Sequence, residues 1–176
     1  MLDWREEPIG RHHDRKSFDC GIEDLNTHFR RYARRNHESG GAKTFVAVSA
    51  TEPAPILGFY TIGPGAIAFA TVPESLTRRL GRYEEPVFRL GRLAVDRSVQ
   101  GRGLGGDLLL AASARAMAVA AEVGGVALAI DATDGNAARW YERFGAVRLL
   151  DDPLKLILPL AIIAKAVSRG ALPEGG

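Results

Sequence analysis

The chain has 176 residues, of which 46% are apolar and 25% are charged, and its formal net charge is +2. This size and composition fit one globular domain, and we expect a single domain over residues 1–176. The small net charge excludes binding of a polyanion through overall charge, so local clusters must provide any such contact. The single cysteine, Cys20, excludes an internal disulfide framework and a metal site built from cysteines.

The N-terminus carries acidic residues and lacks an apolar signal core. No apolar run approaches about 20 residues, so we expect a cytoplasmic protein without a membrane-spanning helix. Residues 1–17 are polar, and they include the adjacent residues His12, His13 and Asp14. Neighbouring residues point in different directions in regular structure, so we expect a solvated segment and no bound metal.

The stretch from Phe18 to Asn36 has the periodicity of one amphipathic helix. Its apolar face consists of Ile22, Leu25, Phe29, Tyr32 and Ala33. At about 100° per residue, the opposite face holds Arg30, Arg31, Arg34 and Arg35. This basic face is either an ordinary solvated surface or a site for phosphates, which the planar guanidinium group suits well.

Two apolar, β-branched runs follow this helix, Thr44–Ala50 and Ile56–Ile62, and the turn between them predicts a hairpin. The Gly63-Pro-Gly65 sequence is expected to end the second strand. A short helix over Pro73–Leu80 would bring three further arginines close together, namely Arg78, Arg79 and Arg82.

The central stretch combines a strand, a glycine-rich turn and a helix. Val87–Val95 reads as the strand, and Leu108–Val123 reads as a long helix rich in alanine. The turn between them contains Gly101, Gly103, Gly105 and Gly106. Such a layout presents free backbone N–H groups and the positive end of a helix to an anion, and glycine allows a ligand to come close. We expect a phosphate-bearing ligand here; a turn without a ligand is the alternative.

The remaining elements complete a mixed α/β arrangement. Val126–Ile130 reads as a buried strand parallel to the central one, which makes a βαβ unit. Asp134 or Gly135 begins a helix over Asn136–Phe144, and Gly145 ends it. Closing strands are expected at Val147–Leu150 and Leu154–Leu158.

Two motifs compete for the glycine-rich turn. Gly101-x-Gly103-x-x-Gly106 matches the dinucleotide fingerprint, and Asp131 follows the next strand, where a ribose ligand would be needed. However, the βαβ unit starts past the middle of the chain, hairpin strands precede it, and only one further helix follows. These features do not allow a doubly wound sheet to be completed.

The same turn also reads Gln100-Gly-Arg-Gly-Leu-Gly105, and this segment resembles the acetyl-CoA signature of the GNAT superfamily of N-acetyltransferases. Asn136 followed by Trp140-Tyr-Glu-Arg-Phe-Gly145 resembles a second motif of that family. The order of elements from Lys43 to Leu158 is also similar. The resemblance implies a GNAT fold of the α/β (α+β) class, with a mixed, mostly antiparallel sheet flanked by helices and a central βαβ unit that binds acetyl-CoA.

A narrower resemblance involves Phe18-Asp-Cys-Gly21, the strand Leu90–Ser98 and the Tyr141 motif. These segments are similar to toxins of type II toxin–antitoxin modules, which acetylate the amino group of aminoacyl-tRNA. The resemblance implies acetyl-CoA as cosubstrate, aminoacyl-tRNA as acceptor, a ribbon–helix–helix antitoxin as partner, a homodimer and a cytoplasmic location in a bacterium. The basic residues named above, Arg30, Arg31, Arg34, Arg35, Arg78, Arg79 and Arg82, would then hold the tRNA backbone.

The resemblance also assigns roles to residues of the site. Tyr141 would protonate the CoA thiolate as general acid. Backbone groups of three strand residues, Leu93, Ala94 and Val95, would bind the pantetheine arm. Backbone N–H groups of the turn would cradle the pyrophosphate, from Gln100, Gly101, Arg102, Gly103, Leu104, Gly105 and Gly106. Asn136 would either bind the cofactor or cap its helix.

No general base is obvious, although Asp131 is a candidate base or a residue that positions water. The identity of the amine stays open at this stage. One alternative is a GNAT enzyme that acetylates a small amine or a protein N-terminus. Another is a non-catalytic regulator that binds CoA or a nucleotide.

Overall fold

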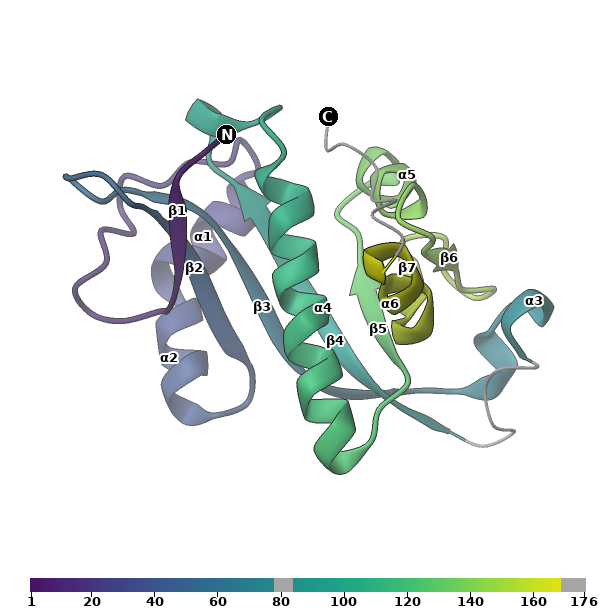
Figure 1. Ribbon diagram of the computed structural model, residues 1–176. Coiled ribbons are helices and arrows are strands. Elements are labelled where there is room, and N and C mark those ends of the chain that lie inside the picture. The colour runs from purple at the N-terminus through teal and green to yellow at the C-terminus, as the bar shows by residue number, and fades with distance from the viewer. Residues whose placement is uncertain (78–83, 169–176) are drawn as a thin grey trace. The chain divides into compact units, whose positions relative to one another are not determined.

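The computed structural model describes residues 1–77 and 84–168 and is drawn as a ribbon in Figure 1. Arg78, Arg79 and Arg82 lie outside the described residues, so their expected grouping stays a prediction. The described residues form two compact units. The first unit contains residues 1–63 and 92–112, and the second contains residues 64–77, 84–91 and 113–168.

Across the described residues, seven strands form one mixed sheet with the order β1-β2-β3-β4-β5-β7-β6. The β4 and β5 strands pair in parallel, whereas the β1–β2, β2–β3, β5–β7 and β6–β7 pairs are antiparallel. This arrangement confirms the expected mixed, mostly antiparallel sheet. The strand bounds are β1 Trp4–Pro8, β2 Lys43–Ser49, β3 Ile56–Ile67, β4 Glu85–Val95, β5 Ala127–Asp131, β6 Val147–Arg148 and β7 Lys155–Pro159.

The helices agree with the expected order, with one addition near the C-terminus. They are α1 Glu23–Arg31, α2 Ala33–Ser39, α3 Glu74–Thr77, α4 Leu104–Val123, α5 Gly135–Glu142 and α6 Leu160–Ser168, with 3₁₀ turns η1 at Phe69–Thr71 and η2 at Arg97–Val99. The sequence did not predict α6. The α4 helix begins at Leu104 rather than Leu108, so Gly105 and Gly106 belong to its first turn.

The predicted helix over residues 18–36 is two helices, α1 and α2, separated at Tyr32. The guanidinium group of Arg15 donates a hydrogen bond to the Arg30 carbonyl (2.8 Å), which an uninterrupted helix would use internally. A side chain that enters the hydrogen-bond ladder is a common cause of a kink. Because of this kink, Tyr32 is 49% exposed instead of joining the apolar face. Ile22 is also exposed, and it precedes the first turn of α1.

Aromatic side chains from three elements form the core of the first unit. Phe18, which precedes α1, lies 4.9 Å from Phe29 of α1, measured between ring centroids. Phe29 stacks on Phe59 of β3 at 4.3 Å. All three side chains are almost completely buried, as are Leu25 and Ala33 of the predicted apolar face. Burial of these rings fixes α1 against the sheet within the first unit.

The N-terminal segment is ordered, contrary to the expectation of a solvated stretch. Residues Trp4–Pro8 pair with β2 as an edge strand, and their charged side chains suit an edge. His13 is buried and lies 2.8 Å from Glu7 through Nε2, while its Nδ1 accepts a hydrogen bond from the Gly10 N–H. Bonds to His13, Arg5 and His12 lower the pKa of Glu7 to about 2. The contacts of His12 and His13 with Glu7 thus hold the loop after β1 against that strand.

The β3 strand continues through Gly63-Pro-Gly65, where the sequence predicted an end. The register between β2 and β3 ends at the pair Lys43–Ile62, so Pro64 lies beyond the reach of β2. A proline without an N–H group costs little at such an edge. The extension carries β3 into the second unit, where β5, β7 and the residues near Leu149 contribute the buried core.

The 20-residue helix α4 is long and apolar enough, by length and composition, to cross a membrane. The expectation that no apolar run approaches this length is therefore wrong for α4. Its residues Leu104, Leu108, Leu109, Ala112 and Ala116 are buried, as in a core helix of a folded protein.

Candidate active site

The glycine-rich loop has the geometry of an anion cradle within the first unit. Gly101 and Gly103 have φ angles of +74° and +86°, which residues with a side chain rarely adopt. A Cβ atom placed on either glycine would meet nothing within 4 Å, so the space beside the loop is open. The N–H groups of Leu104, Gly105 and Gly106 belong to the first turn of α4, where a helix leaves its donors unpaired.

The side chain of Gln100 fixes the base of this loop. Its Nε2 donates to the carbonyl oxygens of Cys20 and Val95, each at 2.9 Å. The Gln100 side chain is thus a structural anchor, and only its backbone can serve a ligand in the way predicted.

In the first unit the sheet ends at β4, so Arg92–Val95 forms an edge of that unit. The N–H of Asp96 donates to the Leu57 carbonyl of β3 at 2.8 Å. Backbone groups alternate in direction along a strand, so Leu93 and Val95 direct theirs to the outer edge. Ala94 directs its carbonyl toward β3, close to Gly58. The backbone groups of Leu93 and the N–H of Val95 are therefore directed away from β3, while the Val95 carbonyl already accepts a hydrogen bond from Gln100 Nε2.

The segment Phe18-Asp-Cys-Gly21 is hydrogen-bonded to the base of the loop, a physical role that the sequence pattern does not reveal. The Asp19 carboxylate accepts hydrogen bonds from the Gly21 N–H and from Asn26 Nδ2, both at 2.8 Å. The backbone carbonyl of Asp19 accepts a third hydrogen bond, from the Arg97 N–H at 2.9 Å. Asp96 in turn accepts from the Asp19 N–H at 3.0 Å and caps η2 through Ser98. These bonds position η2, from which the glycine loop continues.

Tyr141 lies in the second unit, on α5, and is 6% exposed. Its ring packs edge-on against Trp140, with 4.9 Å between the centroids. Burial raises the pKa of the Tyr141 phenol above its ordinary range, and the negative charge of Asp131 raises it further. The phenol therefore keeps its proton at neutral pH and can act as a donor.

Asp134 caps α5 by accepting a hydrogen bond from the Ala137 N–H at 2.8 Å. The capping role considered for Asn136 thus belongs to Asp134. Asn136 itself is exposed, and its side-chain oxygen accepts a hydrogen bond from Arg139. Contact between Asn136 and a cofactor stays a prediction.

The four arginines of the predicted basic face differ in their surroundings. Arg30 is partly buried and donates to the Phe18 carbonyl at 2.6 Å, and Arg34 forms an ion pair with Glu38 at 2.7 Å. Arg31 and Arg35 are exposed. Arg30 therefore has a structural role, and only Arg31 and Arg35 present largely exposed side chains.

Residues 41–145 match the family model described as the acetyltransferase (GNAT) domain. The chain belongs to the GNAT acetyltransferase family. This assignment decides between the two interpretations of the loop, because the mixed sheet is not the doubly wound sheet of a dinucleotide-binding domain.

Similarity to individual GNAT proteins extends over most of the chain. A tRNA-acetylating toxin of Mycobacterium tuberculosis is 36% identical over 145 residues, which cover 82% of this chain and 85% of the toxin. The structure of AtaT complexed with acetyl-methionyl-tRNAfMet has a TM-score of 0.85 and 27% identity, covering 94% of this chain and 99% of AtaT.

A second solved structure contains both acetyl-CoA and a protein partner. It is an AtaT mutant with one tyrosine replaced by phenylalanine, bound to acetyl-CoA and the C-terminus of the antitoxin AtaR. Its TM-score is 0.80 at 25% identity, covering 94% of this chain and 99% of that one.

Proposed function

We propose that this GNAT enzyme transfers the acetyl group of acetyl-CoA to the α-amino group of an aminoacyl-tRNA and thereby blocks translation. The observation that carries the proposal is similarity over more than four fifths of the chain to a protein named as a tRNA-acetylating toxin. The complex of AtaT with acetylated methionyl-tRNA supports the same acceptor class.

The loop residues fit acetyl-CoA. Open space beside Gly101 and Gly103 lets a phosphate group approach the backbone, and the start of α4 supplies N–H donors of the required polarity. Arg102 is exposed next to these glycines and adds a positive charge. Leu93 and Val95 offer strand-like hydrogen bonds to an extended chain such as pantetheine.

The reaction forms one N–C bond and breaks the thioester C–S bond; the amine loses a proton and the sulfur gains one. Tyr141 holds a proton at neutral pH, and we assign it as the donor to the departing sulfur. The proton released by the amine restores the phenol. The α-amine of an amino acid has a pKa of about 7.7–8.0 in peptides, and an ester lowers it, so a strong base is unnecessary.

The remaining parts of the proposal concern partners and location. The AtaT complex with its antitoxin supports an antitoxin partner for this chain, and we propose one of the ribbon–helix–helix type. A homodimer in the bacterial cytoplasm, where acetyl-CoA and charged tRNA both occur, is part of the same proposal. Arg31 and Arg35 are the exposed members of the predicted basic face, and they are the two that we assign to tRNA phosphates.

The test is acetyl transfer from labelled acetyl-CoA to total charged tRNA, with deacylated tRNA as the negative control. We expect label on charged tRNA with the wild type, and a kcat about 10²- to 10⁴-fold lower with Tyr141→Phe. Tyr32→Phe, which changes an exposed tyrosine, is the matched control. A protein that binds acetyl-CoA but leaves charged tRNA unlabelled would refute the acceptor assignment and favour another amine.

A further inference from the structure

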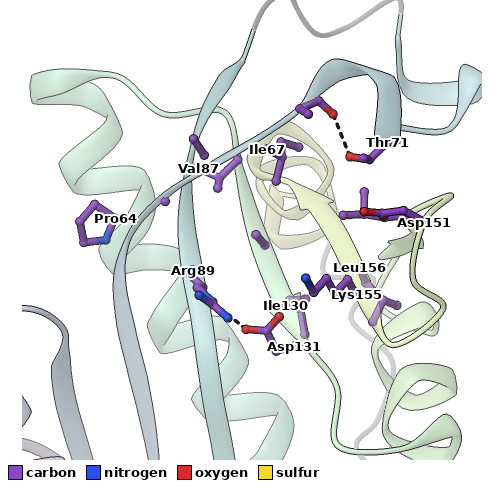
Figure 2. A pocket seen from close by; sticks show the side chains of 15 residues that line it. Pro64, Ile67, Thr71, Val87, Arg89, Ile130, Asp131, Asp151, Lys155 and Leu156 are labelled. Carbon is purple, nitrogen blue, oxygen red and sulfur yellow. Dashed lines mark hydrogen bonds and ion pairs between the residues drawn. The ribbon is translucent and has the colours of Figure 1, made fainter.

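A cavity of about 320 Å³ opens on one face of the sheet, entirely within the second unit (Figure 2). Arg89 of β4 pairs with Ala129 of β5, so these two residues lie side by side on one face. Residues two positions away along each strand share that face. The cavity lining therefore includes Gly65, Ile67, Val87, Arg89, Ala129 and Asp131.

The cavity has an aliphatic wall and a charged rim. Val87, Ile67 and Ala129 supply apolar surface, whereas Arg89 Nε lies 2.7 Å from Asp131 Oδ2 at the rim. Figure 2 shows this ion pair between β4 and β5, with Lys155 close to Asp131. The Arg89 and Asp131 side chains are 61% and 31% exposed, and an ion pair this exposed contributes at most about 1 kcal/mol to stability.

The cavity lining includes one residue, Asp131, whose charge acts on the proposed proton donor. Asp131 is near enough to Tyr141 for its charge to affect that phenol, and both residues belong to the second unit. Arg89 and Asp131 both line the cavity, and their hydrogen bond joins Arg89 Nε to Asp131 Oδ2, so the other nitrogens of Arg89 and the Asp131 Oδ1 atom take no part in it.

These features match one end of the proposed acceptor. An aminoacyl ester carries a basic amine, a side chain of variable size, and a ribose with a phosphate beyond it. A carboxylate suits the amine, a guanidinium group suits the phosphate, and an aliphatic wall suits the side chain. A volume of about 320 Å³ is at the lower limit of small-molecule sites, near 300 Å³, and leaves room for an aminoacyl group.

We infer that this cavity receives the aminoacyl end of the acceptor, that Asp131 binds its α-amine, and that Gly65 sets the space for its side chain. The inference rests on the proposed function, because it concerns the acceptor of that reaction. Arg89 orients Asp131 through their ion pair, and it faces the ribose–phosphate portion.

Gly65 is the position at which this assignment is easiest to test. A Cβ atom at Gly65 would lie 3.5 Å from Arg89 Cβ and from Val87 Cγ2, which is ordinary van der Waals contact. The backbone of Gly65 does not have a positive φ angle. A side chain there can thus be accommodated without strain, and it would fill the cavity.

The experiment measures kcat and KM for acetylation of glycyl-, alanyl-, valyl-, methionyl- and phenylalanyl-tRNA. With Gly65→Val we expect kcat/KM to fall at least tenfold for the larger amino acids that the wild type accepts, and less than twofold for the smallest. With Asp131→Asn we expect KM for the acceptor to rise about tenfold while the Kd of acetyl-CoA is unchanged. Asp131→Glu should restore part of the loss.

Glu142→Gln is the matched control, because Glu142 is also paired with an arginine, Arg148, but does not line the cavity. Gly65→Ala provides a milder change if Gly65→Val melts at a lower temperature. The inference would be overturned if Gly65→Val affected every amino acid equally or if the KM for the acceptor were unchanged in Asp131→Asn. It would also be overturned if the wild type acetylated only glycyl-tRNA. Failure of the proposed function is distinct, because the wild type would then label none of the charged tRNAs.

Discussion

Asn26 connects the N-terminal segment to the base of the cofactor loop, and its replacement by alanine has a defined cost. The side chain is 2% exposed; its Oδ1 accepts from the Cys20 N–H at 2.9 Å, and its Nδ2 donates to Asp19 at 2.8 Å. Asn26→Ala leaves the Cys20 N–H without a partner, and an unsatisfied buried donor costs about 1–3 kcal/mol.

We therefore expect Asn26→Ala to lower the free energy of unfolding by about 2 kcal/mol. For a chain of this length, each kcal/mol shifts the Tm by roughly 2–4 °C, so the Tm should fall by about 4–8 °C. Thermal melts and urea unfolding measure both quantities. Asn36→Ala is the control, because Asn36 is an exposed asparagine on α2.

The same variant should weaken binding of acetyl-CoA. The Cys20 carbonyl holds Gln100 Nε2, and loss of one hydrogen bond worth about 1 kcal/mol corresponds to roughly a fivefold rise in Kd. Calorimetric titration with acetyl-CoA at a temperature where both proteins are folded measures this change. A Tm within about 1 °C of the wild type would refute the assignment of Asn26 as a buried anchor, and an unchanged Kd would refute its coupling to the loop.

Three further predictions follow from the loop, the buried histidine and the exposed arginines. Gly103→Ala should lower the free energy of unfolding, measured in urea, by about 1–2 kcal/mol, because the φ angle of +86° is strained for alanine. Gly41→Ala is the control and should lower it less; equal losses in the two variants would contradict the prediction. Burial, and then Arg92, lower the pKa of His28 from 6.5 to about 4, so the unfolded chain takes up a proton first as pH falls. The stability contributed by neutral His28 is thus complete above pH 6.5 and declines toward pH 4. We expect His28→Phe to remove this decline, which urea unfolding at pH 7 and pH 5 measures. The same decline in both proteins would disprove the prediction. Replacing Arg31 and Arg35 by glutamine should reduce the salt dependence of tRNA binding by about one unit of slope for each lost phosphate contact, and an unchanged slope would exclude them from the interface.

The glycine loop and the start of α5 could be predicted from the sequence because local residues determine them. Gly101 and Gly103 adopt the positive φ angles that glycine permits, Asp134 caps α5, and Gly145 follows its end. The motif around Tyr141 singles out this residue in the sequence. Its burial, however, depends on packing in the second unit, which the periodicity of the sequence does not reveal.

The predictions from the sequence were wrong where contacts between distant residues decide the structure. The break at Tyr32 depends on Arg15, which lies outside the helical pattern. The β3 strand continues past Pro64 because the neighbouring β2 strand has already ended, and a single sequence does not show where a neighbour ends. The charged strand β1 lacks an alternating apolar pattern, since an edge strand can carry charge on both faces.

The bonds at the base of the cofactor loop have a consequence for how the protein opens. Gln100 and Cys20 are separated by 80 positions, and Asp96 and Asp19 by 77, so the loop and the segment before α1 must come apart together. Amide hydrogens in the two segments should accordingly exchange with solvent at one common rate, as in a single cooperative unit.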